Sequence, residues 1–253
     1  MPSLDQSPSL LHGLRRWWGE RVPRAGFGTT ARQFATEMWE FLRDSTPERR
    51  RQRYGDVDFD WEYRVDTTSA TVAWRDRLLG VLHSPYQPTE PALFREMIEA
   101  LGIDYRRYTF VDLGSGKGRT LLMASEYPFH KIVGVELLPH LHRVAEDNVK
   151  KFLSGKKISC EIETICGDAA VFPLQPEPLV LYLFNPLPEA GLETVVANLE
   201  RSLADVPREA LVVYHNPLLE HVLARSCSLR KVRGTAQYAL YASELTRAMA
   251  VSN

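Results

Sequence analysis

Residues 110–119, which read FVDLGSGKGR, constrain the fold of this chain more than any other segment. An apolar run leads into Asp112 and then into three glycines at alternate positions, Gly114, Gly116 and Gly118. Glycine has no Cβ, so such a turn adopts positive φ easily and lets a ligand approach the main chain. The pattern predicts a buried strand, a tight turn and a helix, with a phosphate or another small polar ligand at the turn.

The residues that follow two further apolar runs indicate which class of ligand fits this turn. Residues 131–135 lead into Glu136, one strand-helix-strand unit after the first run, where a carboxylate can accept hydrogen bonds from both hydroxyls of a ribose. Residues 159–166 lead to Asp168, which can accept from an adenine amine while the neighbouring backbone N–H, that of Ala169, donates to the ring. A nicotinamide oxidoreductase fits poorly, because its third glycine would fall at Arg119.

Each acid also has a structural interpretation. Asp112 could cap a helix, Glu136 could be a solvated strand end, and Asp168 could be an ordinary turn residue. Their order and spacing favour a shared ligand site over three separate structural roles.

These residues resemble the class I S-adenosylmethionine-dependent methyltransferases. The glycine-rich first motif of that family looks like residues 112–118, its ribose acid like Glu136 and its adenine acid like Asp168, and the resemblance covers residues 85–245. The resemblance implies S-adenosylmethionine as the cofactor. The loop at residues 83–88 would approach the methionine end of that cofactor. The residues expected to bind the cofactor are Asp112, Gly114, Ser115, Gly116, Glu136, Asp168, Ala169 and Tyr86. The same motif also resembles that of the histone-core lysine methyltransferases built on this fold.

The alternation of strand-like and helix-like segments predicts an α/β fold, a doubly wound, mostly parallel seven-stranded sheet with helices on both faces. The resemblance implies that the last strand is antiparallel. A helix is expected from Thr89, as N-cap, with Pro91 just inside its start. The strands are expected at residues 108–113, 131–136, 159–166, 179–184, 210–214, 228–232 and 237–241. Between them, helices are expected at residues 117–126, 139–153 and 189–204.

Residues 1–84 are expected to form an α-helical N-terminal extension before a methyltransferase domain at residues 85–253. Within the extension, residues 54–66 are dense in aromatic and acidic side chains. They are either a lid over the cofactor or a segment whose rings pack into the core. The basic run at residues 48–53 is either a solvated surface or a binding site for an acidic partner.

Two residues at strand ends are candidates for catalysis. Asn185 follows the fourth strand in the sequence FNPLP, which partly matches the Asn/Asp-Pro-Pro-aromatic motif of N-methyltransferases in this family, where the asparagine aligns the target nitrogen. Leu187 and Pro188 replace the proline and the aromatic residue, which argues against a flat nucleobase as acceptor. His215 ends the fifth strand, and its ordinary pKa of about 6.5 would suit a general base for an oxygen nucleophile. The alternative is a structural histidine that is satisfied by its neighbours, which is the commoner role at a strand end.

Composition limits the partners. The 253 residues are 44% hydrophobic and carry a net charge of −1, which gives no general attraction to nucleic acid. Three cysteines without metal-ligand spacing are interpreted as core residues of a protein in a reducing compartment, and no metal site is expected. There is no leader-like N-terminus and no apolar run of transmembrane length, so a cytoplasmic location is expected.

We therefore expect a methyltransferase that acts on an N or O atom of a small molecule or a protein side chain. A non-catalytic protein that binds the cofactor or a partner through the same fold is the alternative. Oligomeric state is left open by the sequence.

Overall fold

The computed structural model describes part of the chain, in two compact units formed by Met1–Pro88 and Thr89–Asn253. The described residues are 18–19, 22–23, 26–43, 57–68, 88–155, 160–185 and 187–246. The basic run at 48–53 and the loop residue Tyr86 lie outside them, so the predictions made for both stay predictions.

The first unit contains the helices α2, Phe27–Arg43, and α4, Val57–Tyr63. After α4, the carboxylate of Asp60 accepts hydrogen bonds from the backbone N–H groups of Thr67 at 2.8 Å and Thr68 at 2.9 Å. These bonds hold the turn that follows the helix. Trp61, in contrast, is 84% exposed, so not every ring of this aromatic segment is packed inward.

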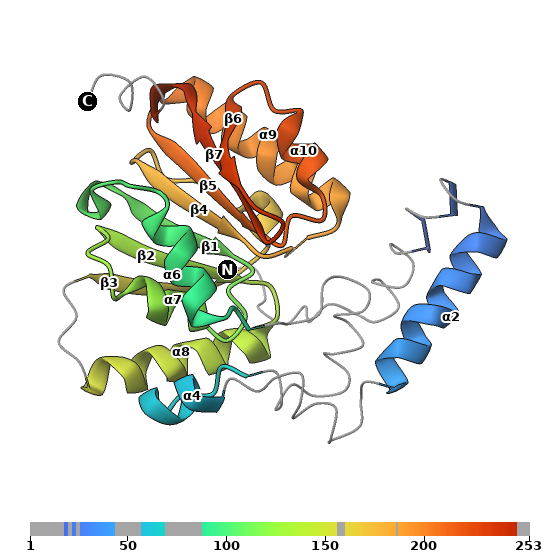
Figure 1. Cartoon of the computed structure of the whole chain (residues 1–253), viewed down its shortest axis with the longest axis horizontal. Coiled ribbons are helices and arrows are strands. Elements are labelled where there is room, and N and C mark those ends of the chain that lie inside the picture. The colour runs from blue at the N-terminus through green and yellow to red at the C-terminus, as the bar shows by residue number, and fades with distance from the viewer. Residues whose placement is uncertain are drawn as a thin grey trace, which may run out of the picture. The chain divides into compact units, whose positions relative to one another are not determined.

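The second unit is a seven-stranded sheet in the order β3-β2-β1-β4-β5-β7-β6 (Figure 1). Strands β1 to β5 are parallel, and β7 is antiparallel to both β5 and β6, which confirms the predicted mostly parallel sheet. The strands are β1 Thr109–Leu113, β2 Lys131–Glu136, β3 Glu161–Cys166, β4 Leu179–Leu183, β5 Ala210–His215, β6 Leu229–Gly234 and β7 Tyr238–Ser243.

Helices cover both faces of this sheet. The α-helices of the unit are α6 Pro91–Glu99, α7 Arg119–Ala124, α8 Pro139–Gly155, α9 Glu189–Asp205 and α10 Glu220–Ala224. Two 3-10 turns are also present, η2 Tyr105–Arg107 and η3 Ala169–Val171. The predicted helix at residues 117–126 is shorter than expected, and the five-residue α10 was not predicted because so short a segment has little periodicity.

Alternation along the strands divides the core into two layers. One face of the sheet carries Val111, Leu181 and Val212 and packs against apolar residues of α9 and α10. On the other face, the ring of Phe94 in α6 contacts those of Phe110 and Tyr182, at centroid distances of 6.1 and 5.8 Å. β1, β4 and β5 are buried along their whole length, as expected for inner strands with both faces covered (Figure 1).

The second face carries a row of polar side chains near the carboxyl ends of its strands. Asp112 on β1 lies directly opposite Tyr182 on β4, and His215 on β5 lies opposite Tyr238 on β7. Because side chains alternate along a strand, residues two apart share a face, so Glu136 joins this row beyond the position paired with Asp112. The rest of this layer is apolar, so the polar row at the carboxyl edge indicates a candidate functional site.

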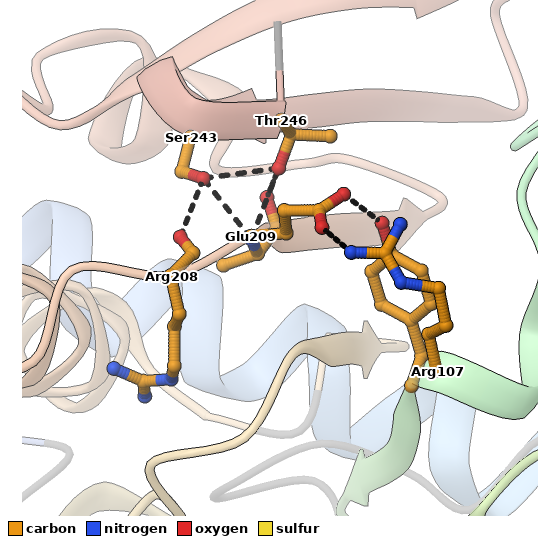
Figure 2. A network of polar contacts seen from close by, with 7 residues as sticks. Arg107, Arg208, Glu209, Ser243 and Thr246 are labelled. Atoms are coloured by element: carbon orange, nitrogen blue, oxygen red, sulfur yellow. Dashed lines mark hydrogen bonds and ion pairs between the residues drawn. The ribbon is translucent and has the colours of Figure 1, made fainter. Parts of the chain in front are cut away.

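At the opposite, amino end of the strands, a polar network ties β1 to β5 and β7 (Figure 2). The carboxylate of Glu209, just before β5, accepts hydrogen bonds from the guanidinium of Arg107 and the hydroxyl of Tyr108. The backbone N–H of Ala210 donates to the Ser243 hydroxyl at 3.0 Å. These contacts satisfy backbone and side-chain groups where the strands begin, so we interpret the network as structural.

Two local predictions were wrong. The N-cap of α6 is Glu90, whose carboxylate accepts from the backbone N–H groups of Ala92 and Leu93, whereas Thr89 is buried and bonds Tyr182 instead. Pro91 does occupy the first turn as predicted. The cysteines are not core residues, since Cys166 and Cys227 are exposed and Cys160 is only half-buried.

Candidate functional site

The glycine-rich turn after β1 is held against β2 by its backbone. Gly114, Gly116 and Gly118 have φ angles of 91°, 55° and 81°, a left-handed conformation that favours glycine at all three positions. The N–H groups of Gly114 and Ser115 both donate to the carbonyl of Val135, at 2.8 and 3.0 Å. The loop therefore has a defined shape at the carboxyl edge of the sheet.

Glu136 joins the end of β2 to this loop. One carboxylate oxygen accepts from the Gly116 N–H and the other from the Leu138 N–H, each at 2.8 Å. Burial raises the pKa of Glu136, although both backbone hydrogen bonds act in the opposite direction. Each oxygen keeps a second lone pair, so the carboxylate can still accept from ribose hydroxyls while it holds the loop.

Asp112 lies beneath the loop rather than at its surface. Its side chain is buried and accepts a hydrogen bond from the Thr120 hydroxyl in α7. Burial raises the pKa of Asp112 to about 7; the Thr120 bond opposes this shift, and the nearby Glu136 carboxylate adds to it. In this position Asp112 connects β1 to the start of α7 through Thr120, and its carboxyl group is partly protonated near pH 7.

Asp168 follows β3 and begins the 3-10 turn η3. Its carboxylate accepts from the Ala170 N–H at 2.9 Å, and its side chain remains exposed. Ala169 is buried beside it. The local turn role is therefore present, and a role in binding adenine stays a prediction.

Asn185 turns the chain after β4 in a left-handed conformation, with φ of 44°. Its amide nitrogen donates to the Asn216 carbonyl at 2.6 Å, and its amide oxygen accepts from the Tyr214 hydroxyl at 2.8 Å. Asn216 has a similar φ of 49° at the end of β5. The turns after β4 and β5 are thus bonded to each other, and the Asn185 side chain lies between them.

His215 is buried at the end of β5 and stacks on Phe184, with ring centroids 3.8 Å apart and an interplanar angle of 24°. Its Nδ1 lies 2.8 Å from the Tyr182 hydroxyl, which lies 2.9 Å from the Thr89 hydroxyl. Burial lowers the pKa of His215 to about 4. The assumption of an ordinary pKa was therefore wrong, and the imidazole is neutral near pH 7.

Topology brings these groups to a single edge of the sheet. The carboxyl ends of parallel strands β1 to β5 lie along one edge, which collects the glycine loop, Glu136, Asp168, Asn185 and His215 (Figure 1). Across the described ranges we find no cluster of three or more side chains that could hold a metal ion. Among those same residues, none of the helices has the length and apolar character needed to span a bilayer.

Comparison with known proteins agrees with this arrangement. A family model described as "Histone methylation protein DOT1" matches residues 83–159, the part that contains the glycine loop and Glu136. The chain is similar in structure to an Escherichia coli protein described as "Putative methyltransferase yhhF", with 18% identity and a TM-score of 0.50 over 63% of this chain and 89% of that one. No curated protein matches the sequence significantly.

An RNA methyltransferase from Salinibacter ruber, solved with S-adenosyl-L-homocysteine, aligns at a TM-score of 0.42 with 21% identity, over 62% of this chain and 92% of that one.

The fold is that of the class I methyltransferases. The family match over the glycine loop and Glu136 supports S-adenosylmethionine-dependent methyltransferase activity on this fold. The predicted likeness to the histone-core branch is confirmed for residues 83–159. That match ends before Asp168, Asn185 and His215, so it covers the glycine loop and Glu136 but none of the residues on the acceptor side.

Sequence reasoning missed the partners of the two catalytic candidates. Tyr182 and Tyr214 were seen only as strand residues, and Asn216 was given no role. One signal was available, because the sequence Asn-Pro-Leu occurs after both β4 and β5, at residues 185–187 and 216–218. A repeated turn on adjacent parallel strands favours two loops of similar shape, and Asn is among the residues that most readily adopt positive φ.

Proposed function

We propose that this protein transfers a methyl group from S-adenosylmethionine to an amine nitrogen of a protein side chain. The observation that supports the proposal is the pair of hydrogen bonds that the Glu136 carboxylate accepts from the N–H groups of Gly116 and Leu138, at the same sheet edge as Asn185 and His215. The family description, which names histone methylation, supports a protein acceptor.

The residues present suit the adenosyl cofactor. Left-handed glycines at 114 and 116 leave backbone without side chains at the turn, and the Glu136 oxygens keep lone pairs for the ribose hydroxyls. Asp168 and the Ala169 N–H would bind adenine, while Ser115, Asp112 and Tyr86 would complete the site on the methionine side. When bound, the cofactor supplies a methyl group already activated on a sulfonium.

On the acceptor side, the protein has to align a nucleophile and exclude water. Alignment of this kind can contribute about 7–11 kcal/mol to lowering a barrier. The turn at Asn185 is suited to alignment, since its side chain is fixed by Tyr214 and by the Asn216 carbonyl. We assign catalytic alignment to this turn, with Asn185 as the residue that fixes it.

An amine is favoured over a hydroxyl because of the state of His215. Its pKa of about 4 makes it a weak base, so a phenol or alcohol that must lose its proton on attack would receive little help. An amine that enters the site in its neutral form needs no base during the transfer, and burial favours that form. A small-molecule amine would satisfy the same chemistry.

The cytoplasmic location stays a prediction.

The test is a methyl-transfer assay with the full chain and labelled S-adenosylmethionine. Lysyl peptides, free amines, phenols and carboxylic acids are offered as separate pools, and lysine-acetylated peptides serve as the matched control. Label transfer to lysyl peptides and its loss on acetylation are expected. Transfer to phenols or carboxylates instead would contradict the choice of amine, and cofactor binding without any transfer would favour the non-catalytic alternative.

A further inference from the structure

Three polar side chains form a hydrogen-bonded series, here called the hydrogen-bond chain, that ends at the imidazole of His215. Thr89 precedes α6, Tyr182 lies on β4, and His215 closes β5, so the hydrogen-bond chain connects three elements through the buried layer. Thr89 is 2% exposed and Tyr182 is 1% exposed. Water therefore has little access to the hydrogen-bond chain. Its donors and acceptors have to pair with one another, and this requirement determines the direction of each hydrogen bond.

Two directions are possible along the hydrogen-bond chain. If Nδ1 of His215 donated to Tyr182, one hydroxyl proton, either that of Thr89 or that of Tyr182, would have no acceptor among the described residues. A buried donor left in that state costs about 1–3 kcal/mol. If Thr89 donates to Tyr182 and Tyr182 donates to Nδ1, every hydroxyl proton has an acceptor. The second direction also ends on the imidazole nitrogen lone pair, so we adopt it.

This direction fixes the tautomer of His215. A neutral imidazole whose Nδ1 accepts a hydrogen bond carries its proton on Nε2. Among the described residues Nε2 has no hydrogen-bond partner, and this atom is not fully enclosed by the protein, so it reaches the surface. The stacked ring of Phe184 restricts rotation of the imidazole, so Nε2–H has a defined direction at the carboxyl edge.

We propose that His215 presents a neutral Nε2–H donor to the methyl acceptor, and so selects amines whose own molecule carries a carbonyl or carboxylate oxygen that can accept from this donor. This inference rests on the proposed function for its substrate. It excludes a general-base role for Nε2, because that nitrogen already holds a proton. The site lies on the acceptor side, since β5 is separated from the glycine loop strand β1 by β4.

The groups around His215 agree with a neutral ring. Asp112 on β1 lies opposite Tyr182, Tyr238 on β7 pairs with His215, and Glu96 on α6 accepts from the Tyr238 hydroxyl at 3.0 Å. Among the described residues, neither Asp112 nor Glu96 forms an ion pair with the imidazole. Burial lowers the pKa of His215 to about 4, and protonation of Nδ1 would also displace the bond from Tyr182.

The first experiment reads the tautomer directly. ¹⁵N NMR of the full chain with labelled histidine, assigned by comparison with His215→Gln, is expected to show a protonated Nε2 and an unprotonated Nδ1 between pH 6 and 8. Tyr182→Phe removes the donor to Nδ1, and a mixture of tautomers is expected there. A protonated Nδ1 in the wild type would overturn the inference. This measurement needs no turnover, so it stands apart from any failure of the proposed function.

The second experiment tests selection by the donor. The probes are a short lysyl peptide, free lysine and n-butylamine, which offer a peptide carbonyl, a carboxylate and no oxygen. His215→Gln places an amide N–H near the position of Nε2 and is expected to keep the preference for the oxygen-bearing amines. His215→Leu is expected to reduce that preference about fivefold, as for loss of one neutral hydrogen bond, through KM for the acceptor.

The comparison between the peptide and free lysine identifies which oxygen is recognised. Equal losses of preference in His215→Gln and His215→Leu would overturn the donor role. A change confined to KM for S-adenosylmethionine would also overturn it, because it would place the donor on the cofactor.

Discussion

The carboxylate of Glu136 and the backbone N–H of Gly116 are joined by a hydrogen bond of 2.8 Å, which connects the end of β2 to the loop after β1. A single side chain therefore shapes the glycine loop and offers its remaining lone pairs to a ligand. Loss of this side chain should therefore weaken cofactor binding, because both the shape of the loop and the acceptors for the ligand are lost.

Glu136→Ala is expected to weaken S-adenosylmethionine binding by about 1.5–3 kcal/mol, because it removes charge-assisted hydrogen bonds and a support of the loop. Glu136→Gln keeps one acceptor oxygen and should lose less. Titration calorimetry with S-adenosylmethionine and its demethylated product measures both variants. The control is Glu161→Gln, whose carboxylate is exposed at the start of β3. An unchanged dissociation constant in Glu136→Ala would mean that Glu136 is structural.

Asp112 should make stability fall as pH rises. Its pKa is about 7 in the folded chain and near 3.8 in the unfolded one, so the folded state holds an extra proton between these values. The resulting stability is full below pH 3.8 and is lost as pH rises through 7. Asp112→Asn mimics the protonated acid and can still accept from Thr120. It should therefore be more stable relative to wild type at pH 8 than at pH 5, by about 1–3 kcal/mol. Urea unfolding at both pH values measures this, and an identical difference would refute it.

His215 should act in the opposite direction over nearly the same range. Its pKa falls from 6.5 to about 4 on folding, so the unfolded chain binds the extra proton between these values. Its contribution is present above pH 6.5 and is lost as pH falls towards 4. His215→Gln cannot ionise and should lose less stability than wild type between pH 7 and pH 5, as followed by urea unfolding. A steeper acid loss in the variant would contradict the buried, neutral imidazole.

The main features of this fold could be predicted because each depends on local pattern. Alternating apolar strands and amphipathic helices indicated the parallel sheet, and glycines at alternate positions indicated a turn with positive φ. Thr89 was misassigned because threonine is a good N-cap, and only the folded chain shows that its hydroxyl meets Tyr182, 93 positions away. The bonds from Asn185 to Tyr214 and Asn216 are equally non-local. Burial of His215, which lowers its pKa, depends on neighbours on β4 and β7 that lie far from it in the sequence.

Asn185→Ala is expected to lower turnover about 10²–10³-fold while leaving cofactor affinity nearly unchanged, as for loss of a group that supports the transition state. Two effects contribute in this variant, since alanine also tolerates φ of 44° poorly. Asn185→Gly removes the side chain without that strain and separates the two. Tyr214→Phe removes the hydroxyl that donates to Asn185 and should reproduce part of the loss. Steady-state kinetics and calorimetry measure these effects, and full activity in both Asn185→Gly and Tyr214→Phe would make the turn structural only.

Gly134→Ala tests how closely α7 and the glycine loop pack on β2. A Cβ at this position would lie 2.5 Å from Cδ1 of Leu121 and 2.9 Å from the hydroxyl oxygen of Ser115. Leu121 is fully buried and cannot move without disturbing the core, so we expect a loss of about 1–3 kcal/mol of unfolding free energy. Displacement of Ser115 should also weaken S-adenosylmethionine binding, in contrast to a core defect elsewhere. Leu199→Ala, in α9 on the other face, is the matched control, since it should destabilise the chain with little effect on binding. Equal effects of the two variants on cofactor affinity would show that Gly134 acts through general stability, and a difference confined to Gly134→Ala would show that β2 shapes the cofactor loop.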